Sequence, residues 1–351
     1  MRDLSNLTAK IILENRKPEA LFSRDKNILV KEFRALIKHW HPDRNKDPLA
    51  QKVTDHILVL HREALKKLKE DHWIEVAEKL EFEEPGKKKI RMKDGSIKTF
   101  SCYRTTNFEL GSLFIDDNYV LFEIDKSFED LLRNARYQIR SLPFQDQDMA
   151  AEISRYLPEI YDTFSGASGD YLLIRKTPDQ ILLADLLNHY GGTLPGEHIA
   201  WILNCLYNLL TYFSFAGITH NAINPGTLFV SPLRHSIMLL GGWWYATPIG
   251  SPMSALPMET LEHIDGKVLE DKIANANTDL ALASALGAKL LSEKDPFYPI
   301  LNKWFGRSNK EISDSALGEY SLWKYEVLEQ AYGKPQFVEM KVKKEEIYKI
   351  H

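Results

Sequence analysis

The chain has 351 residues, of which 44% are hydrophobic, 11% aromatic and 27% charged. This composition excludes a disordered chain, and the length predicts two or three domains, since one domain usually spans roughly 100–200 residues. The net charge of −4 gives no general case for nucleic-acid binding. Residues 1–72 contain 16 Lys and Arg against 11 Asp and Glu, which gives this part +5 and leaves −9 for the remainder. A basic amino-terminal part on an acidic body suits a partner with an acidic surface.

The two cysteines, Cys102 and Cys205, lie far apart and have neither CxxC nor metal-ligand spacing. A disulfide framework or a metal site is therefore not expected. The amino terminus has no apolar stretch of signal-peptide length, and no run approaches the roughly 18–20 apolar residues of a membrane span. We expect a cytoplasmic protein without a membrane segment.

The first elements along the chain are predicted to be helices. Residues 6–16 form a short amphipathic segment, which Pro18 interrupts. A longer helix follows, with apolar residues at three- and four-residue steps: Leu29, Phe33, Leu36, Ile37 and Trp40. Proline lacks a backbone N–H and disfavours helix in the residue before it. Pro42 should therefore stop this helix, with His41 at its end and Asp43 in the turn.

The opposite face of this helix is basic. It carries Lys31, Arg34 and Lys38, spaced by three and four residues, and Arg44 follows just after the helix stop. A second helical period then places Ala50, Val53, Ile57, Leu60, Ala64 and Leu68 on one face. Two amphipathic helices joined by a short turn predict an antiparallel helical hairpin.

This hairpin resembles the J-domain of DnaJ-type co-chaperones in its sequence KHWHPDRN, its two amphipathic helices and its basic face. The resemblance covers roughly residues 5–72. It implies that His41, Pro42 and Asp43 dock on a DnaK-type (heat-shock 70 class) chaperone and trigger its ATP hydrolysis. The electrostatic contacts would then fall on Lys31, Arg34, Lys38 and Arg44. The alternative is a helix stop, a polar turn and a solvated basic face.

We place the J-domain at residues 1–80 and a linker at 81–88, where the charged stretch EFEEPGKKK breaks the helical pattern. The chain lacks the Gly/Phe-rich segment and the CxxCxGxG zinc repeats of DnaJ itself, so only the J-domain would be shared with that family. Residues 89–180 are assigned to a small lobe. Residues 181–351 are assigned to a larger helical lobe with a carboxy-terminal tail.

From Lys89 onward the apolar period changes to two, which predicts a hairpin around Asp94-Gly95 and another turning at Asp116 to Asn118. Further predicted elements are helices at about 127–142 and 149–156, the strand YLLIRKT, a helix from about 181, a long apolar helix at about 198–215 and a helix at 314–332. The tail alternates loosely, which favours a strand with a solvated end. The expected fold class is an all-α helical hairpin followed by an α+β bilobal domain.

The segment after the long apolar helix resembles the catalytic core of protein kinases, where a loop H-R-D-x-K-P-x-N precedes a strand ending in Asp-Phe-Gly. We align His220 with the His of that loop and Pro225 with its Pro. Ala222 then stands where a catalytic Asp would be, and Thr227 stands where an Asn would hold magnesium. Gly241-Gly242-Trp243 replaces Asp-Phe-Gly.

Asp279 matches the Asp that opens a buried helix in kinases and hydrogen-bonds the backbone of the catalytic loop, which is a structural role. A positioned general base contributes about 10²–10⁴-fold, and the metal-holding Asp neutralises developing charge, so Ala222 and Gly241 can replace neither. There is no GxGxxG, only Gly111 in ELGS, and the strand lysine is either Lys126 or absent, with Glu123 in the other register. The resemblance implies a pseudokinase without a cofactor.

Three functions remain open at this point. The first is a J-domain co-chaperone that is not an enzyme, whose kinase-like body binds an unknown protein client. The second is a divergent kinase-fold phosphotransferase that binds nucleotide. The third, nucleic-acid binding through the basic helix face, ranks lowest because the body is acidic. Trp243 and Trp244 either fill the would-be nucleotide pocket or belong to the core.

Overall fold

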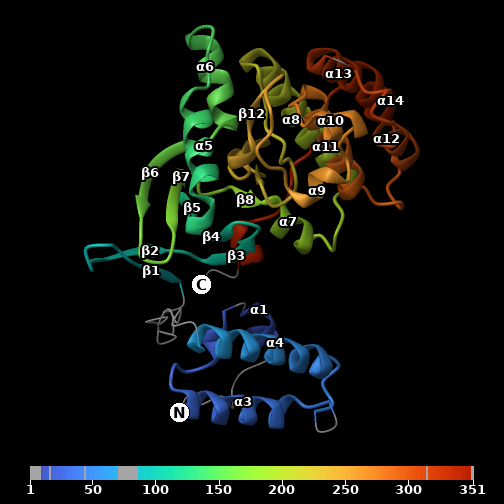
Figure 1. The fold of residues 1–351 in the computed structure, drawn as a ribbon. Coiled ribbons are helices and arrows are strands. Elements are labelled where there is room, and N and C mark those ends of the chain that lie inside the picture. Colours follow the sequence, from blue (N-terminus) through green and yellow to red (C-terminus); the bar gives the residue numbers. More distant parts are fainter. Residues whose placement is uncertain (1–8, 16, 43–44, 70–85, 314, 349–351) are drawn as a thin grey trace. The chain divides into compact units, whose positions relative to one another are not determined.

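The computed structural model describes all residues except 1–8, 16, 43–44, 70–85, 314 and 349–351. The chain divides into two compact units, Met1–Phe82 and Glu83–His351 (Figure 1). The predicted class is confirmed, because a helical part precedes a sheet-rich lobe and a mostly helical lobe.

The smaller unit is built around two long helices that lie side by side (Figure 1). Its elements are α1 (Ala9–Glu14), α2 (Pro18–Leu21), α3 (Lys26–Trp40) and α4 (Ala50–Lys69). The predicted apolar faces meet in one core, to which α3 gives Leu29 and Leu36 and α4 gives Val53 and Ile57. The Thr54 hydroxyl donates to the carbonyl of Trp40 at 2.8 Å, which fixes α4 to the end of α3.

The small lobe of the larger unit is an antiparallel sheet in the order β3-β4-β5-β7-β6. These strands are β3 (Arg104–Phe108), β4 (Gly111–Ile115), β5 (Tyr119–Ile124), β6 (Glu159–Ser165) and β7 (Asp170–Arg175). Helix α5 (Glu129–Arg140) packs on one face of the sheet beside β6 and β7, and its buried residues belong to the same core as Val120 and Phe122. The separate hairpin of β1 (Lys87–Arg91) and β2 (Ile97–Ser101) covers Leu121 on the other face.

The helical lobe follows α6 (Gln147–Ile153) and the small-lobe sheet. Its helices are α7 (Leu183–His189), α8 (Gly196–Ala216), α9 (Met258–Leu261), α10 (Gly266–Asp271), α11 (Ala276–Leu290), α12 (Tyr298–Phe305), α13 (Ala316–Leu322), α14 (Glu329–Tyr332) and α15 (Lys344–Tyr348). Its short strands are β8 (Ile181–Leu182), β9 (Ile218–Thr219), β10 (Leu228–Ser231), β11 (Ser236–Leu239) and β12 (Thr247–Pro248). The 3-10 turns are η1 (Lys126–Phe128), η2 (Ser154–Tyr156) and η3 (Trp243–Tyr245), and the π-turn η4 (Trp323–Leu328) joins α13 to α14.

Helix α8 forms the centre of the helical lobe. Its 21 residues make it long and apolar enough to span a membrane, and 61% of its most apolar window is buried inside the larger unit. The expectation that no run approaches a membrane span was therefore wrong for this helix by length and composition. A buried core helix meets the same criterion, because it is apolar on most of its surface.

Several predicted elements differ from the structure. Strand β6 was not predicted, and the carboxy-terminal tail ends in helix α15 instead of a strand. The predicted linker 81–88 falls mostly outside the described residues, and its last two residues, Lys87 and Lys88, belong to β1. Both predicted hairpins are present, with β1 pairing with β2 and β4 pairing with β5.

Candidate functional site

The turn after α3 begins where Pro42 was expected to stop the helix. The N–H of His41 still donates to the carbonyl of Ile37 at 2.9 Å, and α3 ends at Trp40. Asn45 then holds the turn, because its N–H donates to the His41 carbonyl at 2.9 Å and its side chain donates to the His39 carbonyl at 3.1 Å. His41 is half-buried and Pro42 is exposed. Asp43 and Arg44 lie outside the described residues.

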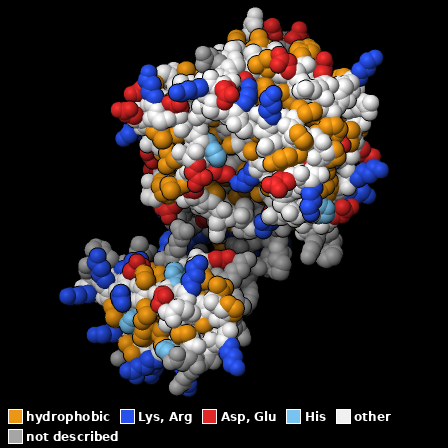
Figure 2. Space-filling model, turned by 90° about the vertical axis from the view of Figure 1, so that its right-hand side faces the viewer, with side chains coloured by type: hydrophobic (Ala, Val, Ile, Leu, Met, Phe, Trp, Pro, Cys, Tyr) orange, Lys and Arg blue, Asp and Glu red, His pale blue; other side chains and the backbone are white. Residues whose placement is uncertain are grey.

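The three predicted helix cations share one side of α3. Lys31, Arg34 and Lys38 are all exposed, while Leu29 and Leu36 on the other side are buried. Within the described residues, no carboxylate forms an ion pair with any of the three cations. Figure 2 shows Lys and Arg side chains over the visible face of the smaller unit. Unpaired charges next to a proline-stiffened turn form a surface that can attract an acidic partner.

In the larger unit, the second predicted site is organised by Asp279. Its carboxylate accepts hydrogen bonds from the N–H of His220 at 2.6 Å and from the N–H of Asn221 at 2.8 Å. This is the contact that the kinase resemblance implied for Asp279, which lies near the start of α11. Burial raises the pKa of Asp279 to about 6, although both backbone hydrogen bonds oppose the shift.

The side chain of His220 is fully buried between aromatic rings. Its ring lies 6.2 Å from Phe213 and 5.0 Å from Trp243, measured between centroids. Burial lowers the pKa of His220 to about 3, so the ring is neutral at neutral pH. A neutral, buried imidazole held among aromatic rings serves packing, because it reaches no solvent from which a substrate could approach.

The loop closes on itself at the positions that the sequence alignment matched with kinase catalytic groups. Ala222 is buried, and the Thr227 hydroxyl donates to its carbonyl at 2.7 Å. Gly242 has a φ of 83°, and a Cβ there would lie 2.6 Å from the His220 ring and 2.8 Å from the Ala222 Cβ. A Cβ on Gly241 would lie 3.2 Å from the Thr227 Cα. A side chain at Gly242 would therefore collide with the loop, and one at Gly241 would be tightly confined.

The two tryptophans after β11 have different surroundings. Trp243 belongs to the helical-lobe core, where its Nε1 donates to the Leu239 carbonyl at 2.8 Å. Trp244 packs on the small-lobe sheet, with ring centroids 5.0 Å from Phe108 and 5.3 Å from Phe122. One tryptophan is therefore plain core, and the other fills space between the two lobes.

Hydrogen bonds fasten the same segment to the small lobe. The Tyr245 hydroxyl donates to Glu109 at 2.6 Å, and the Asn134 amide of α5 donates to the carbonyls of Trp244 and Ala246 at 3.0 and 2.9 Å. No local pattern in the sequence predicted these contacts, because the partners are more than a hundred residues apart.

The two positions considered for a kinase-type strand lysine, Glu123 and Lys126, both have side-chain partners away from the face of β5 that lies toward Trp244. Glu123 lies on the opposite face of β5 from Phe122, where it pairs with Lys88 at 3.2 Å and accepts from Tyr171 at 2.5 Å. The Lys126 ammonium donates to the Ala167 carbonyl at 2.7 Å. The face of β5 toward Trp244 carries Val120, Phe122 and Ile124, which are all buried and apolar.

The carboxy-terminal tail lies against both lobes. The Tyr348 hydroxyl accepts from the N–H of Leu182 at 3.0 Å, and its ring centroid lies 4.8 Å from that of Tyr103. Lys344 forms an ion pair with Asp117 in the small lobe. Helix α15 therefore connects the small lobe to the segment that leads into the helical lobe.

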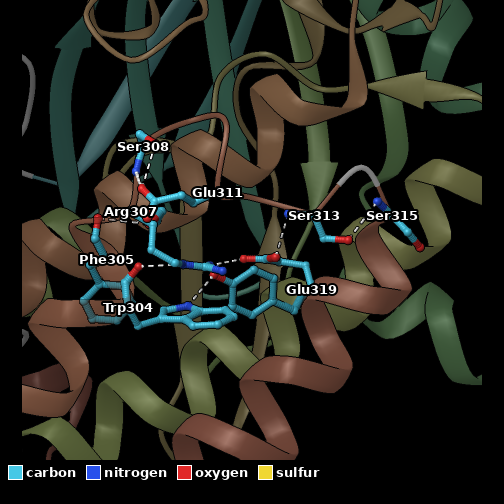
Figure 3. Close-up of polar contacts among 10 residues, drawn as sticks. Trp304, Phe305, Arg307, Ser308, Glu311, Ser313, Ser315 and Glu319 are labelled. Atoms are coloured by element: carbon cyan, nitrogen blue, oxygen red, sulfur yellow. Dashed lines mark hydrogen bonds and ion pairs between the residues drawn. The ribbon is translucent and has the colours of Figure 1, made fainter.

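A buried ion pair supports the far end of the helical lobe (Figure 3). Arg307 pairs with Glu319 of α13, which also accepts from the N–H of Ser313 at 3.0 Å. The Arg307 guanidinium lies 3.3 Å from the centroid of Trp304, whose indole N–H donates to Tyr207 at 3.1 Å. This network is structural. Among the described residues, no three His, Cys, Asp or Glu side chains gather as a metal site.

No protein-family model matches the sequence, and no curated protein matches it. Among solved structures, the autoinhibited serine kinase domain of the giant muscle protein titin is similar, at 12% identity and a TM-score of 0.45. The similarity covers 64% of this chain and 75% of that chain. A likeness this low assigns no activity. The larger unit consists of a five-stranded lobe and a helical lobe around α8, and Asp279 makes the two backbone contacts that the kinase resemblance of the sequence implied.

Proposed function

We propose that the protein is a J-domain co-chaperone that binds a DnaK-type chaperone and stimulates its ATPase. One observation carries the proposal: the hairpin of α3 and α4 presents Lys31, Arg34 and Lys38, which form no ion pair among the described residues, beside the His41-Pro42 turn. The helical hairpin is compatible with a J-domain, and its sequence contains the motif His-Pro-Asp at that turn. Asp43 and Arg44 complete the proposed docking surface.

The proposed contact works by steering and by low entropic cost. Exposed charges at the rim of an interface raise the rate of encounter with a surface of opposite charge. The turn is held by Asn45 and stiffened by Pro42, so less conformational entropy is lost when its side chains meet the partner. The stimulated chaperone would then act on a client held by the larger unit.

The larger unit is proposed to be a pseudokinase that binds a protein client and needs no cofactor. Three features support an inactive centre: Ala222 offers no base, Gly242 has no room for a side chain, and the apolar face of β5 offers no lysine. Trp244 fills space beside that face. A phosphotransferase needs a positioned base and charge-neutralising groups at these places.

A cytoplasmic location is part of the same proposal, because a DnaK-type partner and reduced thiols belong together there. Cys102 and Cys205 are both buried and form no disulfide. This agrees with a reducing compartment.

The test is the single-turnover ATPase rate of a bacterial DnaK-type chaperone, measured with and without the full chain. Stimulation should be lost with Asp43→Asn and with His41→Gln, while Asp47→Asn, a matched change just beyond the turn, should leave it intact. Stimulation that survives both changes would overturn the assignment of the docking residues. An unstimulated rate with the unaltered chain would overturn the proposed function.

The alternative hypothesis, a nucleotide-binding phosphotransferase, is tested by isothermal titration calorimetry with ATP and magnesium. We expect no binding heat. Micromolar binding that is abolished by magnesium chelation would contradict the pseudokinase proposal and favour a divergent enzyme.

A further inference from the structure

The hairpin β1–β2 is firmly seated on the outer face of the small-lobe sheet. Ile90 of β1 is buried in a cluster with Phe114 and Tyr171. Phe100 of β2 stacks on Phe164 with ring centroids 5.6 Å apart. In Figure 1 the hairpin is a ribbon of its own beside the five-stranded sheet. Its inner face is therefore fixed, and its outer face is a rigid surface.

The outer face carries a row of cations. Lys87, Lys89 and Arg91 alternate along β1, and all three are exposed. Within the described residues, no carboxylate pairs with Lys89 or Arg91. The inward cations Lys88 and Lys98, by contrast, pair with Glu123 at 3.2 Å and Asp162 at 3.5 Å. The hairpin thus balances its inner charges, whereas Lys89 and Arg91 on the outer face have no carboxylate partner within the described residues.

Strand β2 also has an open hydrogen-bonding edge. The ladder with β1 is flanked by bonds from the N–H of Cys102 to Gly86 and from the N–H of Met92 to Ser96. Antiparallel pairs alternate between bonded and non-bonded, so the N–H and C=O groups of Ile97, Thr99 and Ser101 point away from β1. Within the described part of the chain, β2 pairs with no strand other than β1.

The other edge of the hairpin is partly covered. The N–H of Ala167 donates to the Arg91 carbonyl at 2.8 Å, and Met92 forms a bridge with Gly166. The edge of β2 is therefore the place where a further strand can add.

Register connects the open edge to the cations. Ile97, Thr99 and Ser101 lie directly opposite Arg91, Lys89 and Lys87 and share their face. Thr99 and Ser101 are small, so the long cationic side chains can extend over them toward a strand added beside β2. Alternate residues of that strand would repeat every ~6.7 Å, which is also the spacing of the cations along β1.

We propose that the edge of β2 binds an extended peptide segment with acidic residues at alternate positions, by strand addition. A peptide backbone supplies both donors and acceptors for the open N–H and C=O groups. A DNA backbone offers only acceptors to this edge, and the aromatic rings of Phe100 and Phe164 are stacked on each other instead of being free for bases. This assignment does not depend on a chaperone partner.

The test measures fluorescence anisotropy of a fluorescein-labelled peptide of alternating Glu and Val with the full chain, without any chaperone. We expect saturable binding, weakened about tenfold or more by Thr99→Pro. This change removes an outward N–H of β2 without removing a ladder hydrogen bond to β1. The double variant Lys89→Glu, Arg91→Glu should weaken binding by a similar factor, and Lys303→Glu on the exposed surface of α12 should not.

Four results would overturn the proposal. They are equal binding of a Lys-Val peptide, full binding by the Lys89→Glu, Arg91→Glu variant, full binding by a folded Thr99→Pro variant, and preferential binding of oligothymidylate. Circular dichroism establishes whether Thr99→Pro is folded. If it is not, the charge-reversal pair decides, because exposed surface substitutions leave the fold intact.

Discussion

The two proposed sites treat their polar groups in opposite ways. Around the His41-Pro42 turn, the cations of α3 are exposed and make no ion pair in the described residues. In the proposed pseudokinase centre, Asp279, His220 and Thr227 are buried and bond or pack within the chain itself. A surface that keeps its charges unpaired is available to a partner, whereas a centre whose groups are used internally contributes stability to its own fold.

The largest effect on stability is expected for a substitution of Trp244, which packs between the two lobes of the larger unit. Trp244→Ala should destabilise the larger unit by about 3–5 kcal/mol, because it leaves a cavity between Phe108 and Phe122. Chemical denaturation followed by circular dichroism measures this loss, and the smaller unit should unfold in a separate transition. Tyr245→Phe, which removes only the bond to Glu109, should cost about 1 kcal/mol. A Trp244→Ala variant as stable as the parent would mean that the inter-lobe contact is dispensable.

The pH dependence of stability should reveal the buried His220. Burial lowers the pKa of His220 to about 3 in the folded chain, below the usual value of 6.5. Between pH 3 and pH 6.5 the ring is therefore protonated in the unfolded chain and neutral in the native state. Stability from this group is complete above pH 6.5 and falls by about 1.4 kcal/mol per pH unit as the pH drops. Asp279 has the opposite slope, since its raised pKa of about 6 makes stability fall as pH rises from about 4 to 6.

His220→Leu separates these two slopes. As the pH falls from 6.5 to 3, the free energy of unfolding of the variant should rise steadily relative to that of the parent. Denaturation curves at several pH values measure this difference. Parallel curves for parent and variant would show that the ring is not held neutral.

A smaller effect is expected at Asp279. Asp279→Asn should cost about 1–3 kcal/mol above pH 6, because an amide can accept from only one of the two backbone N–H groups and leaves the other buried without a partner. The matched change Asp265→Asn, at an exposed helix start where the side chain accepts from Lys267, should cost much less. Equal costs for the two variants would remove the special role assigned to Asp279.

The smallest effect on stability, and the sharpest contrast, is expected on α3. The triple change Lys31→Gln, Arg34→Gln, Lys38→Gln should alter stability by no more than about 0.5 kcal/mol per residue, since the side chains are exposed. It should nevertheless slow chaperone stimulation about 10-fold or more at low salt, with a smaller difference at high salt. ATPase rates at a low and a high ionic strength measure the loss of stimulation and its dependence on salt. A salt-independent loss would point to misfolding instead of lost steering.

Local patterns in the sequence predicted the elements they determine. The apolar period of α3 and the stop at Pro42 were readable because a helix repeats its buried face every three or four residues. Strand β6 escaped prediction because it lies at the sheet edge with its side chains mostly half-buried, so its pattern is weak. In the tail, Met340 and Val342 do alternate into the core, but none of the described strands pairs with them, and the described part of the chain ends in helix α15.

Contacts between distant segments could not be predicted from one sequence. The fit of Trp244 between Phe108 and Phe122, and the bond from Leu182 to Tyr348, join residues brought together only by the finished fold. The sequence showed Ala222 and Gly241 at the positions aligned with kinase acidic groups, but it did not show the lack of space at Gly242, which depends on the positions of His220 and Ala222.

The contact between Lys344 and Asp117 also sets an order of events during synthesis. These residues are 227 positions apart, so at roughly 5–20 residues per second the ribosome needs about 11–45 s to add the second after the first. The small-lobe surface around Asp117 and Tyr103 therefore lacks its contacts with α15 during that time, while the amino-terminal helical unit can already be folded. The newly made body thus passes through a period of exposure before α15 closes over it.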